Sequence, residues 1–161
     1  MKEIQEAQQK WIVAKDAAQE KCEKSHDYEM ARKLCACQMF TGNESLEDMI
    51  TLMFSPQGLE FLTTNHFPDL ETFRTFKKYC PERYGVYIDC GEISLADERY
   101  VFLVGNTTAE LSYAETNRNR VALMWGAKAH IKASGFSIVK VEKDDISTVN
   151  VEKSDFAKVL L

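Results

Sequence analysis

The chain has 161 residues, of which 45% are apolar and 28% charged, and its formal net charge is -5. This length and apolar content suffice for one folded domain or for two small ones. Residues 1–85 carry 11 basic and 14 acidic side chains, and residues 86–161 carry 9 and 11. Neither part has the positive excess that is typical of proteins whose main partner is nucleic acid.

The cysteine content and the opening residues indicate a reducing compartment. The five cysteines are an odd number and form no Cys-x-x-Cys pair, a pattern typical of free thiols. Residues 1–6 are charged and lack the apolar stretch of a signal peptide. No segment approaches the length of a membrane span. We therefore expect a cytoplasmic protein with neither a membrane partner nor a nucleic-acid partner.

Residues 3–24 show the periodicity of an amphipathic helix. Its apolar side chains recur at intervals of three and four and form one stripe: Ile4, Ala7, Trp11, Ala14 and Ala18. An average spacing of about 3.5 residues also fits the seam of a coiled coil. Three alanines would give such a seam little apolar surface, so we expect the stripe to dock onto the chain's own fold.

Four shorter helices are predicted before the β structure begins. Their ranges are about 28–40, 46–54, 56–64 and 69–79. Gly42 is the predicted C-cap glycine of the first of these helices. Ser45 begins a variant of the capping box with Asp48, and Ser55 precedes a proline at the permitted first helical position. Pro81 ends the last helix.

These segments define a helical head, residues 1–83, that is followed by a β domain, residues 84–161. No Pro-rich or Gly-rich linker separates the two parts. Aromatic residues are concentrated near the junction: Phe67, Phe73, Phe76, Tyr79, Tyr84 and Tyr87. We interpret the helices as a cap on the open end of the β domain, because a bare terminal strand exposes apolar surface and unpaired backbone groups.

The β domain repeats itself about every twenty residues. One apolar column contains Ala109, Ala129 and Val149, and the members of a parallel column are Leu111, Ile131 and Val151. A second set of paired positions shows the same recurrence with one interval of eighteen: Val101/Leu103, Val121/Leu123, Val139/Val141 and Val159/Leu161. The two members of each pair are separated by two residues, which is strand periodicity, and a fixed period of this length indicates a repeat architecture.

We therefore predict an α+β protein in which the helical head packs on a parallel β-solenoid of about four coils. Residues 86–95 are a candidate for a shorter first coil, and Gly105, Gly126 and Gly135 are placed at tight corners. A β-sandwich or cupin-like barrel with N-terminal helices is the alternative, since such folds also contain many short, regularly spaced strands. The recurrence at twenty favours the solenoid.

A metal site could be drawn only from scattered residues of the head, namely Cys22, His26, Cys35 and Cys37. On a helix, Cys35 and Cys37 project about 200° apart, because each residue advances about 100°. Zinc sites also favour two to four residues between paired ligands. We expect these cysteines to be structural and predict no metal and no other cofactor.

His130 is the candidate catalytic residue of the β domain. It faces outward between Lys128 and Lys132, and hexapeptide-type acyltransferases are solenoids that use a histidine between neighbouring subunits. Their shorter repeats and coils differ from the twenty-residue period found here, so we expect a surface histidine and assign no catalytic residue. Asp144 and Asp145 form an acidic pair in a predicted corner, and two such carboxylates are normally solvated rather than bound to calcium.

The chain resembles a group of small uncharacterised proteins from gut Bacteroidetes and their mobile elements. The likeness covers about residues 45–161 and is carried by the segments Asn65–Glu71 and Tyr84–Tyr87, followed by a repetitive β tail. It implies no activity. The repeat alone is also loosely similar to that of bactofilins, whose β-solenoids polymerise end to end but carry disordered tails instead of a helical head.

These observations predict a non-enzymatic structural or protein-interaction protein in which a rigid solenoid provides a self-association or partner-binding surface. We place a homotypic contact at the C-terminal edge, at Val159, Leu160 and Leu161. One alternative is a small-ligand binder or enzyme with a pocket where the helices meet the first coil. Its lining would be Arg83, Tyr84, Tyr87 and Cys90. A hexapeptide-like acyltransferase is the other alternative.

Overall fold

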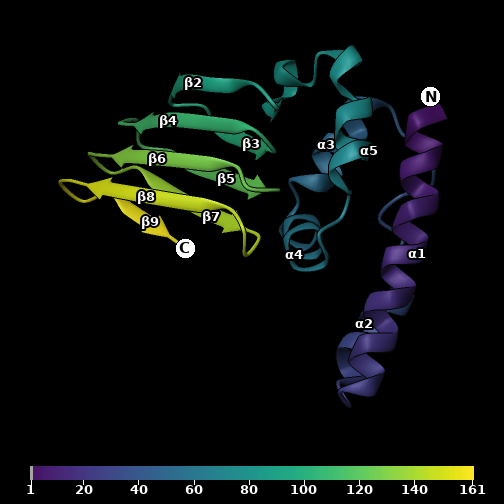
Figure 1. Ribbon diagram of the computed structural model, residues 1–161. Helices are drawn as coiled ribbons and strands as arrows, with labels where there is room; N and C mark the ends of the chain where they lie inside the picture. Colours follow the sequence, from purple (N-terminus) through teal and green to yellow (C-terminus); the bar gives the residue numbers. More distant parts are fainter. Residues whose placement is uncertain (1) are drawn as a thin grey trace. The chain divides into compact units, whose positions relative to one another are not determined.

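The computed structural model describes residues 2–161, which divide between Pro68 and Asp69 into two compact units (Figure 1). The first unit contains four helices: α1 (Lys2–Lys24), α2 (Tyr28–Ala36), α3 (Leu46–Met53) and α4 (Pro56–Asn65). The second begins with the short helix α5 (Leu70–Thr75) and two 3-10 turns, η1 (Lys77–Tyr79) and η2 (Pro81–Tyr84). Its remainder is a parallel β-solenoid, so the predicted α+β class with a solenoid is confirmed.

The apolar stripe of α1 is buried within the first unit. Ile4, Ala7, Trp11 and Ala18 are buried, and α1 packs against α2. The Trp11 ring meets the ring of Phe40 edge to face, with 5.8 Å between centroids. The stripe is therefore occupied by the chain's own side chains, as expected from its small residues.

The helix caps are partly as predicted. Ser45 and Asp48 form a reciprocal capping box, and Ser55 caps α4 ahead of its proline. The predictions for α2 were wrong at its end, because the helix stops at Ala36 instead of Phe40 and Gly42 is not its C-cap. The Glu44 carboxylate accepts the N–H of Gly42 at 2.8 Å and organises a separate loop, from which the ring of Phe40 reaches Trp11.

The predicted fifth helix is also shorter than expected. Asp69 caps α5 by accepting the N–H of Thr72 at 2.8 Å, and the helix ends at Thr75. The remainder of the predicted range forms η1, after which Cys80 adopts the left-handed conformation. Two 3-10 turns, η1 and η2, therefore separate the end of α5 from the first strand.

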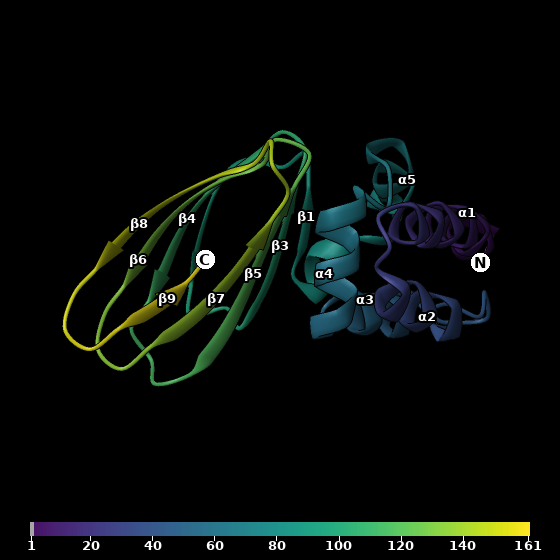
Figure 2. The same ribbon diagram turned by 90° about the horizontal axis from the view of Figure 1, so that it is seen from below.

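Each coil of the solenoid contributes one strand to each of two parallel sheets (Figure 2). The odd sheet contains β1 (Val86–Ile88), β3 (Tyr100–Val104), β5 (Arg118–Met124), β7 (Ile138–Lys143) and β9 (Lys158–Leu160) in that order. The even sheet contains β2 (Gly91–Ala96), β4 (Thr107–Tyr113), β6 (Lys128–Ala133) and β8 (Thr148–Lys153). Figure 2 shows the coils as flattened rings, with one sheet on each long side.

The strand register confirms the columns. Ala109 pairs with Ala129, and Ala129 pairs with Val149, so the three lie directly over one another. The first coil is shorter, since Val86 pairs with Phe102. The predicted interval of eighteen was wrong. Val141 pairs with Val121 and Val139 pairs with Asn119, so the period stays at twenty because a buried polar residue occupies one interior position.

The strands β3 and β5 are buried on both faces. Val101, Leu103, Val121 and Leu123 belong to the core inside the coil. The outward residues Phe102, Val104, Ala122 and Met124 are also buried. The ring of Phe73 on α5 contacts the ring of Phe102 edge to face, with 5.6 Å between centroids. In this unit α5 therefore contacts the outer side of the odd sheet at Phe102.

Aspartate side chains tie each corner of the solenoid to a neighbouring coil. They accept a backbone N–H one coil away in four cases: Asp89 from Asn106 at 2.9 Å, Asp97 from Ala114 at 2.8 Å, Asp144 from Trp125 at 2.6 Å and Asp155 from Gly135 at 3.1 Å. The expectation that the Asp144–Asp145 pair is solvated was wrong for Asp144, which is only 2% exposed. These contacts satisfy backbone donors that the strand ladder leaves unpaired at the turns.

Replacing Asp144 with Ala should destabilise the protein by about 1–3 kcal/mol, because two backbone donors, of Trp125 and Ser147, lose their buried acceptor. Urea unfolding followed by circular dichroism would measure the loss. The matched control is Glu98→Ala at an exposed corner position, which should change stability by less than about 0.5 kcal/mol. Equal effects of the two substitutions would contradict the proposed role of Asp144.

The Asp89 carboxylate should make stability depend on pH. Its hydrogen bond with the Arg74 guanidinium, 2.7 Å long, holds the pKa of Asp89 below its ordinary value. A lowered folded-state pKa contributes stability at neutral pH that is lost as the pH falls below about 4. Asp89→Asn should therefore flatten the acid side of the stability profile. An unchanged slope of urea midpoint against pH would contradict this assignment.

Candidate interaction surface

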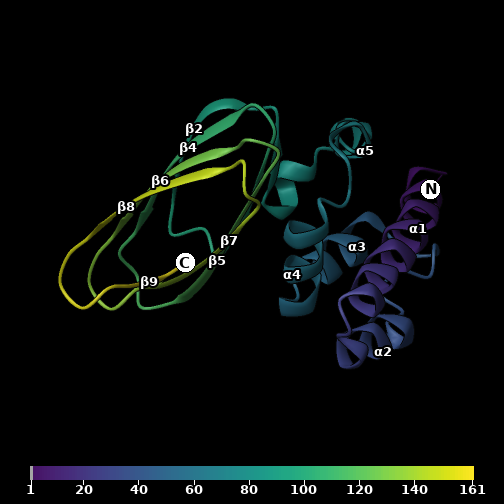
Figure 3. The ribbon, with the colours of Figure 1, turned by 60° about the horizontal axis from the view of Figure 1, so that its bottom comes forward.

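The coil of β8 and β9 is the last coil of the stack within residues 2–161 (Figure 3), and we refer to its free side as the open end. Within residues 2–161, no strand pairs with the far edge of β8 or of β9. The backbone N–H and C=O groups along both edges therefore lack strand partners in the described part of the chain. Unpaired edges of this kind are templates for pairing with another chain.

The interior side chains of this coil are less buried than those of the coils beneath it. Ala129 and Ile131 are 4% and 0% exposed, whereas the residues paired above them, Val149 and Val151, are only half-buried. Val159 is likewise only partly buried against the core. The end of the stack therefore presents an apolar strip between two strand edges.

The three residues predicted at this edge are all located there. Val159 pairs with Val139 and points into the coil, and Leu160 pairs with Lys140 and points outward. Leu160 is 53% exposed and Leu161 is 83% exposed. The structure thus brings the predicted set together on one edge, although its members face different directions.

Two aromatic rings that the sequence analysis missed are stacked at the corner between the even and odd sheets. Phe136 and Phe156 lie 5.0 Å apart between centroids, with 6° between their planes. They are 61% and 71% exposed. Their separation of twenty residues is the signal that could have identified them, because side chains one coil apart occupy equivalent corners.

Two lysines occupy interior rows at the open end. Lys143 pairs with the core residue Leu123, and Lys153 pairs with Ala133. Both lysines are exposed. Inward-pointing charges on terminal strands oppose indiscriminate strand addition. Lys143 Nζ donates to the Asp144 carbonyl oxygen at 3.3 Å, so the ammonium group of Lys153 is the charge that an occupant of this surface would have to accommodate.

His130 bridges neighbouring coils on the outer side of the even sheet. Its Nδ1 lies 3.2 Å from Glu110 Oε2, and its Nε2 lies 2.9 Å from Glu152 Oε1. Lys132 Nζ lies 3.7 Å from the same Glu110 oxygen. Both ring nitrogens are thus occupied by carboxylates of the chain itself, which gives His130 a structural contact on a surface of mixed charge.

The four residues proposed to line a junction pocket lie in η2, in β1 and at the first corner. Arg83 is exposed and Tyr84 half-buried in η2, whereas Tyr87 packs against the interior core of the solenoid. The Cys90 Sγ lies 3.6 Å from the Ile88 carbonyl oxygen, at the first corner. Burial raises the pKa values of the Tyr87 phenol and of the Cys90 thiol, which disfavours the thiolate form that a cysteine nucleophile requires.

Tyr113 is the largest side chain that is fully buried inside the solenoid. Tyr113 pairs in register with Ala133, a residue with a small side chain. The Tyr113 hydroxyl has no hydrogen-bond partner, and burial raises the pKa of this group. The interior around it is apolar, so the phenol fills space and is poorly placed for proton transfer.

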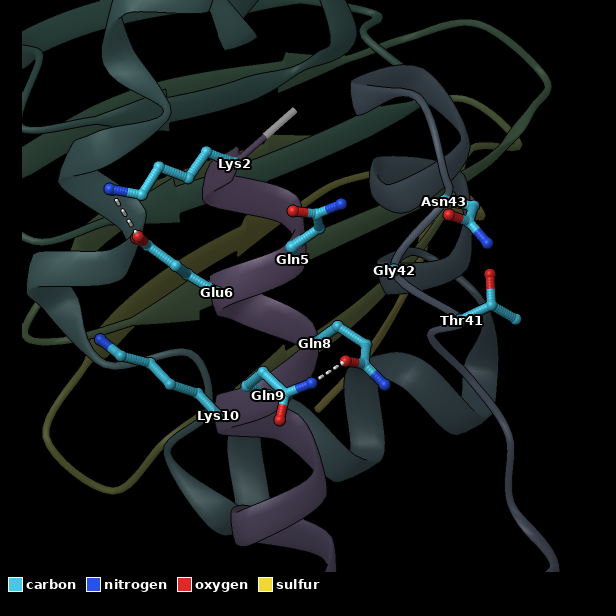
Figure 4. A pocket seen from close by; sticks show the side chains of 9 residues that line it. All are labelled: Lys2, Gln5, Glu6, Gln8, Gln9, Lys10, Thr41, Gly42 and Asn43. Carbon is cyan, nitrogen blue, oxygen red and sulfur yellow. Dashed lines mark hydrogen bonds and ion pairs between the residues drawn. The ribbon is translucent and has the colours of Figure 1, made fainter.

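The first unit has an open hollow between the beginning of α1 and the loop at Gly42 (Figure 4). Its lining residues are Lys2, Gln5, Glu6, Gln8, Gln9, Lys10, Thr41, Gly42 and Asn43. Two side-chain pairs run along the helix surface: Lys2 lies 3.4 Å from Glu6, and the Gln9 amide donates to Gln8 at 2.9 Å. These groups interact with one another along α1 and do not converge on a common point in the hollow.

The candidate metal ligands of the head remain apart. Cys35 is exposed, while Cys22 and Cys37 are half-buried. His26 Nδ1 lies 2.9 Å from the Tyr28 hydroxyl. Across residues 2–161, no group of three or more His, Cys, Asp or Glu side chains has the arrangement needed to hold a metal ion. None of the helices described has the length and apolarity of a membrane span.

Comparisons with protein-family models, with curated proteins and with solved structures found no significant match to this chain.

Alkylation should be slower at Cys90 than at the exposed Cys35 and Cys80, because burial and a raised pKa both reduce the reactive thiolate at Cys90. Brief treatment of the native protein with iodoacetamide, followed by peptide mass spectrometry, would show a several-fold difference. The same treatment in urea should remove the difference. Faster labelling at Cys90 in the native protein would instead indicate an activated thiol and favour an enzyme.

Proposed function

We propose that the protein is a non-enzymatic structural or interaction protein whose solenoid is a rigid body and whose C-terminal coil binds the same coil of a second copy. The observation that carries this proposal is the pair of open strand edges, β8 and β9, on either side of a half-buried apolar strip. Burial of this strip and pairing of both edges would favour association.

The geometry of the open end restricts its occupant. The two edges lie on opposite long sides of a flattened ring (Figure 2). A single added strand would pair with one edge and leave the other unpaired. A second solenoid end offers two strands with the same separation and an apolar strip between them. Because the chain carries such an end, a second copy supplies the complementary surface.

A twofold axis is the symmetry that joins two identical ends. It is self-complementary and closes the assembly at two copies, so it avoids fibre growth. Twofold rotation perpendicular to the solenoid axis also makes the strands of the two copies antiparallel at the contact, a hydrogen-bonding pattern that is at least as stable as the parallel one. The expected product is a dimer of solenoids joined end to end.

Light scattering at several protein concentrations would test the dimer. The wild-type protein should approach twice the monomer mass, and the double substitution Leu160→Lys with Leu161→Lys should shift it toward monomer by introducing charge at the edge. Val13→Lys is the matched control, because Val13 is an apolar side chain that is 69% exposed on α1 and distant in sequence from the edge. A wild-type protein that is monomeric at all concentrations would refute the proposal, as would a dimer that the edge substitutions leave unchanged.

A further inference from the structure

Two twofold arrangements can join the open ends, and they differ in which corners meet. With the axis parallel to the strands, β8 pairs with the partner's β9, and each corner meets the same corner of the partner. With the axis perpendicular to both the strands and the stack, β8 pairs with β8 of the partner. The Phe156 corner then meets the opposite corner, which contains Ile146.

The aromatic stack distinguishes these arrangements. The ring spacing of 5.0 Å between Phe136 and Phe156 is close to the distance of about 4.8 Å between adjacent strands. The ring of one further coil would therefore stack on Phe156 in the same way. The corner lies at one end of the flattened ring, near its long axis (Figure 2). With the axis parallel to the strands, Phe156 of the second copy takes this place and extends the stack to four rings.

The charges on the two edge strands favour the same arrangement. Glu152 lies near the end of β8, and Lys158 begins β9, so both are next to the Phe156 corner. Both are exposed on the outer side of their sheets. When β8 lies beside the partner's β9 with like corners together, Glu152 and the partner's Lys158 are on adjacent strands and the same face. The alternative arrangement places Glu152 beside the partner's Thr148, and the lysine of that outward column, Lys128, lies one strand further from the edge.

The inward-pointing Lys153 is compatible with this contact. It lies at the Phe156 corner, together with Asp155 and Glu152. When like corners meet, these carboxylates of one copy approach Lys153 of the other. The charge that opposes addition of an arbitrary strand is thereby accommodated by a second copy of the same chain.

From the ring stack and the edge charges, which rest on the dimer proposed above, we infer that the twofold axis runs parallel to the strands. In this arrangement Phe156 stacks on Phe156 of the second copy. Two equivalent ion pairs join Glu152 and Lys158 across the interface. The even sheet of each copy continues into the odd sheet of the other.

Complementary charge reversal tests the arrangement. Glu152→Lys alone and Lys158→Glu alone should each weaken dimerisation roughly tenfold, because each homodimer then contains two like-charge pairs. An equimolar mixture of the two variants should form a heterodimer in which both pairs are restored. Its affinity should return toward that of the wild type, measured by analytical ultracentrifugation and native mass spectrometry. Thermal melts would verify that each variant is folded.

A matched control is provided by Glu110, the other carboxylate in contact with His130. Mixing Glu110→Lys with Lys158→Glu should restore only one of the two ion pairs in the heterodimer, since Glu110 lies two coils below the edge, so its affinity should stay below that of the wild type. Phe156→Ser should also weaken the dimer several-fold, because it interrupts the stack. A wild-type dimer without gain in the Glu152→Lys and Lys158→Glu mixture would overturn this arrangement and leave the dimer standing. A monomeric wild type would overturn both.

Discussion

The structure depends on one geometric constraint, which is that every coil must return the chain to a position one strand spacing from where it started. Parallel pairing satisfies the backbone groups along the strands, but each corner interrupts the ladder and leaves N–H groups without a strand partner. The corner aspartates resolve this by accepting an N–H from the next or the preceding coil. With strands and corners both tied to neighbours, a period of twenty residues is maintained from β3 to β9.

Stacking in this way provides hydrogen-bond partners for the backbone groups of every coil except those at the two ends of the described stack. The interior positions of β6 are apolar, whereas those of β8 are two valines, Val149 and Val151, followed by Lys153. This mixture of apolar and charged side chains differs from an apolar core that merely lacks its last layer. The valines favour burial, whereas Lys153 would have to be matched by an opposite charge or by water in the proposed contact. In the proposed dimer this combination would provide selectivity, since apolar surface alone would accept many strands.

Sequence periodicity was sufficient to predict the solenoid, because stacked coils repeat their inward residues and the columns at Ala109 and Leu111 are apolar throughout. It placed Val139 in the wrong row because the paired position holds Asn119, a buried polar residue that hydrophobic patterns do not detect. The corner aspartates were missed for a related reason. An acidic residue in a turn has the same appearance in sequence whether it is solvated or bonded to another coil. The exposed stack at Phe136 and Phe156 was detectable by its spacing, but a search confined to strand columns passes over corners.

The two ends of the solenoid are not equivalent, and this bears on the form of assembly. The first coil is shorter than the others, since β1 and β3 pair at an interval of sixteen residues, and η2 packs against β1. Head-to-tail contact would therefore place a coil of sixteen residues against one of twenty, with corners that do not superimpose. Contact between two C-terminal ends joins coils of identical length, with equivalent corners and self-complementary charges. For the association proposed above, the difference in length between the ends therefore argues for a closed pair over an open filament.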